Sequence, residues 1–260
     1  MYAVFILGTA GSGKSTLASR LVEWYVSKNA YAVTLNLDPG VIDLPYEPDV
    51  DVREYVSIDE IMSKYRLGPN GALILASDLI ADRLDEIQRK VDELNPDYVI
   101  VDTPGQMELF AYRASGMFFA REFRCDAKAS IFLFDPMLVN SPLNMLSIAL
   151  LATSIRLRLG LAQVNVLSKI DLIKKDKLAE LIECSADPAR LEYALQREKD
   201  SELYLLGVSI LKGLRRQGIS MGLLAVSSLT YEGMVNLAGA LARMLREGED
   251  VENGDEMNYA

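Results

Sequence analysis

The most informative absence in this sequence is histidine, since none of its 260 residues is His. Histidine is the usual general base near neutral pH, the usual partner of a catalytic serine or cysteine, and a common metal ligand. Its absence excludes Ser-His-Asp triads, histidine general bases and histidine-bound metals. Any catalysis must use carboxylates, amides, Lys or Arg side chains, or a bound cation.

Cysteine and long apolar runs are also scarce. Cys125 and Cys184 are too few for a disulfide framework and fit no metal motif, so a reducing, cytoplasmic compartment is expected. The longest apolar run, LNMLSIALLATSI (143–155), is too short to span a bilayer and predicts a buried helix. The N-terminal stretch lacks a basic region, and Lys14 follows too soon for a cleaved signal peptide. We expect no membrane association.

The net charge of −10 is concentrated at the C-terminus, where EGEDVENGDE (247–256) holds six acids and no base. Without those six acids the rest of the chain carries −4, which predicts no broad nucleic-acid footprint. We interpret residues 247–260 as a solvated acidic tail, with contact to a basic partner as the alternative.

The chain is half hydrophobic, and its short apolar runs alternate with longer helical patterns. The runs lie at 2–7, 31–37, 98–101, 130–135, 163–167 and 223–226. Such alternation predicts an α/β fold with a doubly wound, mostly parallel sheet covered on both faces. Ser57, Ser141 and Asp187 are expected helix caps. The helical, charged stretch at about 173–218 indicates an insertion before the last strand of a single domain spanning 1–246.

The first apolar run leads into GTAGSGKST (8–16), which matches the phosphate-binding pattern G-x-x-x-x-G-K-[ST]. Glycines let backbone N–H groups surround phosphates, Lys14 reaches the terminal phosphates, and the Ser15 hydroxyl can ligate Mg²⁺ at a helix N-terminus. A strand before and a helix after favour the P-loop NTPase type over a chance match. The predicted nucleotide-binding residues here are Gly11, Ser12, Gly13, Lys14, Ser15 and Thr16.

A second polar strand end occurs in YVIVDTPGQ (98–106). Asp102 is placed to hold Mg²⁺ through water, and the Gly105 backbone N–H can donate to a γ-phosphate. The Gln106 amide could orient the attacking water, or it could be an ordinary surface side chain. NLDPG (36–40) supplies a third strand end, where Asp38 could reach Mg²⁺ or the water, although Asp-Pro-Gly is also a common turn.

The base is predicted from VNVLSKIDL (164–172), which resembles the guanine-reading N-K-x-D element. There Asp171 would accept hydrogen bonds from guanine and the Lys169 stem would stack along the ring. Adenine lacks that donor pair and would leave the carboxylate unsatisfied. Ser168 replaces the usual Asn, whose amide normally ties this loop to the P-loop. Ser227 and Ser228 match the loop whose backbone N–H would donate to guanine O6.

One further stretch, Gly68-Pro69-Asn70-Gly71, has the composition of a simple turn between two helices. Together with the P-loop, Asp38, D-T-P-G-Q and S-K-x-D in this order, it makes the chain resemble the GPN-loop GTPase family, from Met1 to about Arg246. The resemblance implies Mg²⁺-dependent hydrolysis of GTP to GDP by a homodimer, in which Asn70 of one subunit stabilises the terminal phosphate in the other. Related ATPases place a P-loop Lys across the dimer, whereas this chain has Thr9. The resemblance also suggests RNA polymerase or an assembly factor as a partner.

Two helical stretches, 107–123 and 144–161, are candidates for the dimer contact, with burial in the protein's own core as the alternative. Two other functions stay open. A P-loop kinase would pass the phosphoryl group to a small acceptor and needs an Arg-rich lid, for which Arg215-Arg216 is the only adjacent Arg pair. A non-catalytic scaffold would bind nucleotide structurally and use the helical insertion to hold a protein.

Overall fold

The computed structural model describes residues 1–197, 201–216 and 221–256, and its strands within them form one parallel sheet of seven. They are β1 (Tyr2–Gly8), β2 (Ala32–Asn36), β3 (Val50–Asp51), β4 (Tyr98–Asp102), β5 (Ala127–Phe134), β6 (Ala162–Leu167) and β7 (Leu223–Ala225). Their order is β3-β2-β4-β1-β5-β6-β7. The predicted doubly wound α/β fold is confirmed. Only the two-residue edge strand β3 was not predicted, because so short a segment carries no pattern.

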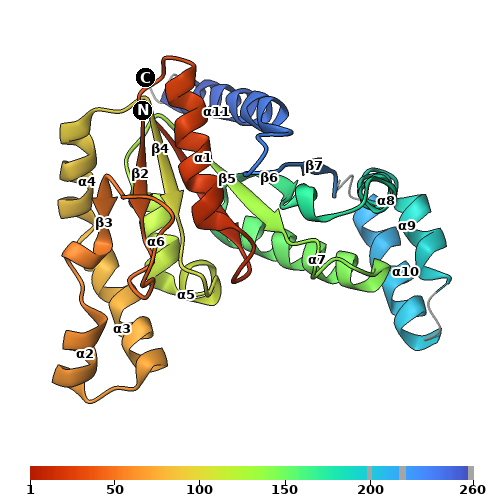
Figure 1. Cartoon of the computed structure of the whole chain (residues 1–260), viewed down its shortest axis with the longest axis horizontal. Coiled ribbons are helices and arrows are strands. Elements are labelled where there is room, and N and C mark those ends of the chain that lie inside the picture. The colour runs from red at the N-terminus through yellow and green to blue at the C-terminus, as the bar shows by residue number, and fades with distance from the viewer. Residues whose placement is uncertain (198–200, 217–220, 257–260) are drawn as a thin grey trace.

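Helices cover both faces of this sheet (Figure 1). They are α1 (Lys14–Ser27), α2 (Ile58–Tyr65), α3 (Pro69–Asp82), α4 (Leu84–Leu94), α5 (Glu108–Ala111), α6 (Ala114–Glu122), α7 (Pro142–Leu159), α8 (Lys175–Ala186), α9 (Pro188–Leu195), α10 (Ser201–Arg216) and α11 (Met234–Glu256). Among these described helices, none has the length and apolar character that crossing a membrane requires.

The central strand β1 shows why this arrangement forms. Successive side chains of a strand point to opposite faces, and both faces of β1 are apolar. Val4 and Ile6 belong to one buried cluster, which includes residues of α1 and α11. Phe5 belongs to the other cluster and stacks on Phe110 beside α6 and α7. The core is therefore two layers separated by the sheet, and β1 is buried in both.

The helix caps read from the sequence are present. Ser57, Ser141 and Asp187 each accept a hydrogen bond from a backbone N–H two or three residues further along, at the starts of α2, α7 and α9. Such caps satisfy donors that the first helical turn leaves unpaired. The predicted insertion contains α8, α9 and α10, and its expected end at Gly218 lies outside the described residues.

The two helices proposed for a dimer contact are largely intramolecular core. In stretch 107–123 most apolar residues are buried, and the exposed large side chains are Tyr112 and Phe118, at 38% and 48% exposure. In stretch 144–161 the exposed apolar side chain is Leu157. At the C-terminus α11 continues through Glu256, so the backbone of the acidic stretch begins as helix. The side chains of residues 247–256 and all of 257–260 lie outside the described part of the chain.

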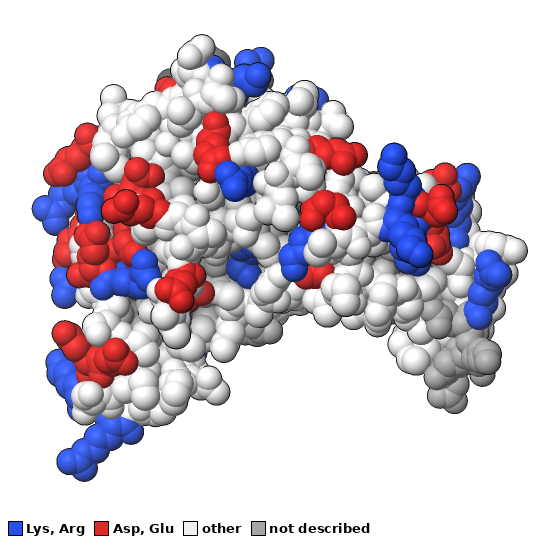
Figure 2. All heavy atoms as spheres, in the orientation of Figure 1, with Lys and Arg blue, Asp and Glu red and all other residues white. Residues whose placement is uncertain are grey.

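Two helical arms extend beyond the carboxyl ends of the strands. Figure 1 shows α2 and α3 extending from one end of the molecule and α8, α9 and α10 from the other, which gives it an arched outline. The surface in Figure 2 is hollowed between these arms, and acidic and basic side chains alternate across the visible face. The N-terminus of α1, and with it the GTAGSGKST loop, lies on the hollowed side.

Candidate nucleotide-binding site

The loop between β1 and α1 has the backbone geometry that its glycines predict. Gly11 and Gly13 have φ values of 75° and 97°, which few other residues adopt readily. Gly13 is also the N-cap of α1, so the loop leads into a helix N-terminus, where backbone N–H groups favour anions. A Cβ at Gly8 would lie 2.7 Å from Ser12 Oγ, so the turn is tightly closed.

Lys14 lies inside this turn and is almost fully buried. Its Nζ donates to the carbonyl oxygens of Gly8 and Thr9, both at 3.0 Å. Burial lowers the pKa of Lys14, and the charges of Asp102 and Asp38 oppose that effect. The ammonium is thus held against the loop, facing the two carboxylates that follow β4 and β2.

Asp102, at the end of β4, is the most buried acid of the site, with 1% of its surface exposed. Its Oδ2 accepts a hydrogen bond of 3.0 Å from the Tyr46 hydroxyl, while Oδ1 has no partner among the described residues. Burial raises the pKa of Asp102 to about 6, opposed by the nearby hydroxyls of Ser15 and Tyr46 and by the charge of Lys14.

The pair formed by Ser15 and Asp102 fits a magnesium ion. A buried carboxylate oxygen without a partner next to a hydroxyl offers the hard oxygen ligands that Mg²⁺ prefers. The described residues contain no group of three or more acidic, cysteine or histidine side chains suited to a metal. A cation here would therefore need phosphate oxygens and waters as well, as Mg²⁺ does in nucleotide sites.

Asp38 lies against the D-T-P-G segment. Its Oδ2 accepts from the Gly105 backbone N–H at 2.9 Å, and its Oδ1 accepts from Gly40 at 3.0 Å. The donor that we predicted for a γ-phosphate is thus bonded to a carboxylate in this structure. Gln106 is exposed, directly after Gly105. The neighbouring Glu108 side chain lies outside the described residues.

The loop after β6 contacts the P-loop directly. Ser168 Oγ donates to the Ser12 carbonyl oxygen at 2.9 Å, and Lys169 Nζ donates to the Gly11 carbonyl oxygen. The hydroxyl of Ser168 thus makes a tie of the kind for which the N-K-x-D element uses an Asn amide. Lys169 itself has φ of 52°, and its stem passes 3.7 Å from the position a Cβ would take on Gly13.

Asp171 is held by a residue that was predicted for a different contact. Ser227 is fully buried, and its hydroxyl donates to Asp171 Oδ1 at 2.6 Å. The Ser227 backbone N–H, predicted to face guanine O6, donates instead to the Glu232 carbonyl oxygen. A cavity of about 190 Å³ lies between these loops. It is lined by Ser12, Gly13, Thr16, Ser168, Lys169, Asp171, Leu172, Ser228 and Leu229.

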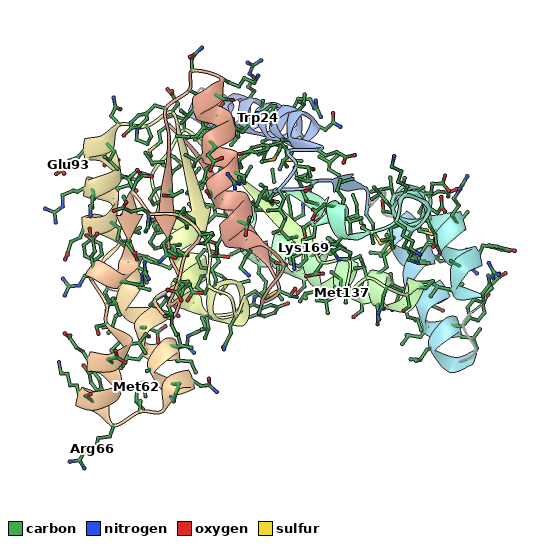
Figure 3. The ribbon with its side chains drawn as sticks, in the orientation of Figure 1. Trp24, Met62, Arg66, Glu93, Met137 and Lys169 are labelled. Atoms are coloured by element: carbon green, nitrogen blue, oxygen red, sulfur yellow. The ribbon has the colours of Figure 1, made fainter. Side chains whose placement is uncertain are left out.

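The Gly-Pro-Asn-Gly stretch does not form the turn itself. Gly68 is the N-cap of α3, Pro69 is its first residue, and Asn70 is exposed in the first helical turn. The chain reverses just before, at Arg66, whose φ is 54°. In Figure 3 Met62 and Arg66 mark the far end of this arm, and Lys169 lies at the carboxyl edge of the sheet.

Known proteins resemble this chain in sequence and in fold. Residues 6–247 match a family described as "Conserved hypothetical ATP binding protein". The chain is 37% identical over 179 residues to the GPN-loop GTPase PAB0955 of Pyrococcus abyssi, covering 68% of this chain and 70% of that protein. The crystal structure of that GTPase in apo form has a TM-score of 0.84 at 30% identity, covering 94% of this chain and 97% of that one. This chain belongs to the GPN-loop GTPase family.

Eukaryotic members of the family match over a smaller part of their length. GPN-loop GTPase 3 of Mycosarcoma maydis is 33% identical over 183 residues, which cover 68% of this chain and 64% of that protein. GPN-loop GTPase QQT2 of Arabidopsis thaliana is 36% identical over 172 residues, which cover 64% of this chain and 45% of that protein. The aligned part of this chain therefore spans about half to two thirds of the length of these relatives.

Sequence reasoning within the family pattern missed two polar residues of the site. Asp135 follows β5, is nearly buried, and pairs with Lys169 Nζ at 2.8 Å. Tyr46, in the segment between β2 and β3, donates to Asp102. The position of Asp135 at a strand end was a usable signal. Tyr46 had none, because its contact joins segments 56 residues apart.

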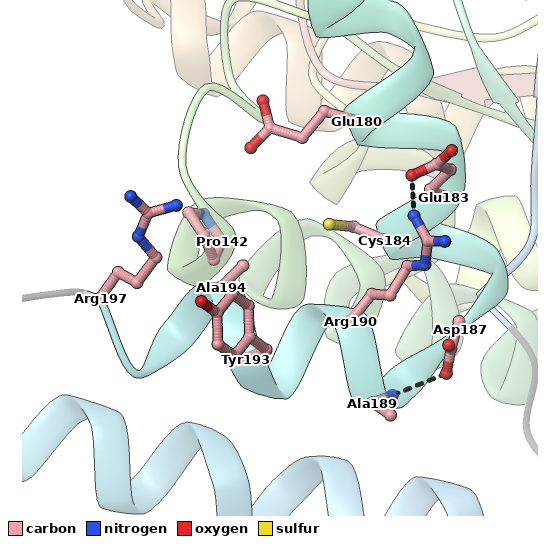
Figure 4. Close-up of a pocket in the computed structure, with 10 residues that line it drawn as sticks. All are labelled: Pro142, Glu180, Glu183, Cys184, Asp187, Ala189, Arg190, Tyr193, Ala194 and Arg197. Carbon is pink, nitrogen blue, oxygen red and sulfur yellow. Dashed lines mark hydrogen bonds and ion pairs between the residues drawn. The ribbon is translucent and has the colours of Figure 1, made fainter.

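A larger cleft lies away from these loops, on the helical insertion. It has a volume of about 850 Å³ and lies between α8, α9 and the start of α7 (Figure 4). Arg190 on its wall is paired with Glu183, and Arg197 and Glu180 add further charges of both signs. Cys184 lines the same cleft as a free, buried thiol whose pKa is raised by burial. The mixed charges give no preference for an anion or a cation.

Proposed function

We propose that this chain is a Mg²⁺-dependent GTPase that hydrolyses GTP to GDP and phosphate. The main support for this proposal is that the loop after β6 is bonded to the P-loop through Ser168 and Lys169. At the 190 Å³ cavity between them, Ser227 donates a hydrogen bond to Asp171. A phosphate cradle and an oriented carboxylate on one connected surface suit a guanine nucleotide. Membership of the GPN-loop GTPase family supports the same reaction.

The chain's own residues would act mainly by positioning and by electrostatics, since phosphoryl transfer needs little covalent help from a protein. The α1 N-terminus and Lys14 would hold the phosphates. Ser15 and Asp102 would hold Mg²⁺, which, when bound, neutralises charge that develops on the phosphate oxygens. Asp38 and Gln106 would orient the attacking water. Asp38 would release the Gly105 backbone N–H, which could then donate a hydrogen bond to the terminal phosphate.

The choice of base follows from Asp171. Its Oδ1 already accepts from Ser227, which fixes the carboxylate plane and leaves Oδ2 for the ligand. Guanine offers two adjacent donors to such an acceptor, whereas adenine would leave a desolvated charge without one. This argument favours GTP, although the family description that matches residues 6–247 names ATP.

The homodimer and the action of Asn70 in trans belong to the same proposal. Asn70 is exposed on an arm that extends away from its own P-loop, a position suited to a second subunit's site. An amide there would stabilise charge on the terminal phosphate, as an arginine finger does in other GTPases. A cytoplasmic location and a partner such as RNA polymerase or an assembly factor complete the proposal at the level of the family.

The kinase alternative has less support from the described residues. Arg216 is exposed at the last position of α10, and the side chain of Arg215 lies outside the described part. The scaffold alternative shares the nucleotide site and differs only in turnover. Measured hydrolysis far below one GTP per hour in a stable dimer would favour the scaffold.

Paired calorimetric titrations of nucleotide-free protein with GDP and with ADP, both in Mg²⁺, test the base. We expect strong preference for GDP in the wild type and its loss in Asp171→Ala, because the mutant has no acceptor for the guanine donors. Asp176→Ala, which removes an acid from the first turn of α8, serves as the control. Equal or tighter ADP binding by the wild type would overturn the GTPase assignment.

A further inference from the structure

The segment between β2 and β3, residues 37–49 and here called the connector, reaches the carboxylate of Asp102 through the side chain of Tyr46. Tyr46 is partly buried, and its ring packs against the apolar cluster beneath α1. Its hydroxyl donates to Asp102 Oδ2 at 3.0 Å. A tyrosine hydroxyl is protonated near neutral pH and a carboxylate can only accept, so Tyr46 is the donor of this bond.

The connector is anchored on both sides of Tyr46. At its end, Asp49 Oδ2 accepts from both the backbone N–H and the hydroxyl of Thr34, at 2.8 and 2.9 Å. Near its start, Arg53 donates to the carbonyl oxygens of Val41 and Ile42. These bonds hold the connector in place, so the position of Tyr46 is fixed by more than its own hydrogen bond.

The contact engages one of the two oxygens of the Asp102 carboxylate. The terminal torsion of an aspartate is broad, so an isolated carboxylate can turn about it at little cost. With Oδ2 held by Tyr46, Oδ1 is left without a protein partner. We propose that Tyr46 is a positioning residue, which orients the Asp102 carboxylate for Mg²⁺ and thereby links the connector to the metal. The proposal rests on the Mg²⁺-dependent nucleotide binding proposed above.

The expected effect is on metal affinity. Hydrogen-bond partners of metal-binding side chains typically change metal affinity 10–100-fold when removed. Tyr46→Phe keeps the ring and its packing and removes only the hydroxyl. We therefore expect about a tenfold higher Mg²⁺ requirement, at the low end of that range, because Asp102 is expected to reach the metal through water.

Release of a fluorescent ribose-labelled GDP, followed over a Mg²⁺ titration and in excess EDTA, tests this without relying on hydrolysis. The measured quantity is the Mg²⁺ concentration that gives half of the maximal slowing of release. Tyr46→Phe should raise that concentration about tenfold and should match the wild-type rate both in EDTA and at saturating Mg²⁺. The control is Tyr25→Phe, because the Tyr25 hydroxyl is buried with no partner among the described residues.

The outcomes separate the two proposals. An unchanged half-point in Tyr46→Phe, with Mg²⁺-sensitive release in the wild type, overturns the role of Tyr46 alone. Faster release by the variant in EDTA, with no shift in the half-point, also overturns it, since Tyr46 would then only support the shape of the site. Wild-type release that does not respond to Mg²⁺ contradicts the metal dependence of the proposed function itself.

Discussion

Substitution of Gly116 by alanine tests the packing behind the D-T-P-G-Q segment. Gly116 lies in the first turn of α6, where alanine would ordinarily be favoured by up to about 1 kcal/mol. A Cβ at this position, however, would lie 2.1 Å from the carbonyl oxygen of Phe110 and 2.7 Å from its carbonyl carbon. Backbone atoms cannot give way as a flexible side chain can, so α5 or α6 must shift.

The size of the effect follows from comparing the two contributions. Overpacking a closely filled site typically costs about 1–3 kcal/mol, and the contact here is with backbone, so we expect the top of that range, about 3 kcal/mol. After the helical gain is subtracted, Gly116→Ala should lower the free energy of unfolding by about 2 kcal/mol. A matched control is Gly213→Ala on α10, where a Cβ would meet nothing within 4 Å. That variant should gain about 0.8–1 kcal/mol.

Urea denaturation and thermal unfolding of both variants, without nucleotide, measure the difference. The two variants should differ by about 3 kcal/mol, a gap of about 6–12 °C in melting temperature for a domain of this size. If Gly116→Ala proved as stable as Gly213→Ala, the close approach of α6 to the Phe110 backbone would be contradicted. If Gly116→Ala also released GDP faster, and Gly213→Ala did not, the strain would extend to the D-T-P-G-Q loop.

Three further predictions concern the nucleotide site. Ser168→Ala should weaken GDP binding about fivefold, measured by calorimetry, because it removes one hydrogen bond to the Ser12 carbonyl, worth about 1 kcal/mol. Asn70→Ala should reduce single-turnover hydrolysis about 100-fold and leave GDP affinity unchanged, and an unaltered rate would contradict the role in trans. Because burial raises the pKa of Asp102 from 3.8 to about 6, folded protein binds that proton more tightly than unfolded protein does. Without metal or nucleotide, the free energy of unfolding should therefore fall as the pH rises from 4 to 6.5, by about 2 kcal/mol more in wild type than in Asp102→Asn, as compared by urea denaturation.

The sequence predicted well those features that depend on neighbouring residues. Alternating apolar runs gave six of the strands in the described part of the chain, and the caps at Ser57, Ser141 and Asp187 mark real helix starts. Polar motifs were also expected after the apolar runs, and Lys14 and Asp102, which follow β1 and end β4, lie close enough to interact because parallel strands bring their carboxyl ends to one edge. Each of these signals is local, or follows from strand order alone.

Contacts set by the path of loops could not be predicted in this way. Ser227 has two donors, its hydroxyl and its backbone N–H, and the sequence cannot tell which of them faces the base-reading loop. In the structure it is the hydroxyl, which bonds to Asp171, while the N–H bonds to Glu232. Likewise, the connector could have run on many paths, and only its folded path brings Tyr46 to Asp102. In the same way, Gly68-Pro69-Asn70-Gly71 has the composition of a turn, yet it begins a helix because the reversal is completed by Arg66 in the left-handed conformation.

The hydrogen bonds from Ser168 and Lys169 to the P-loop carbonyls have a consequence for fragments of the ligand. If the base-binding loop and the P-loop moved independently, each would have to be ordered when its part of the ligand bound. Here the two loops are already held together by hydrogen bonds. A guanine bound at one end therefore holds its attached phosphates at a high effective concentration over the other. Guanosine and pyrophosphate added together should bind far more weakly than GDP, because the covalent link between them supplies that local concentration.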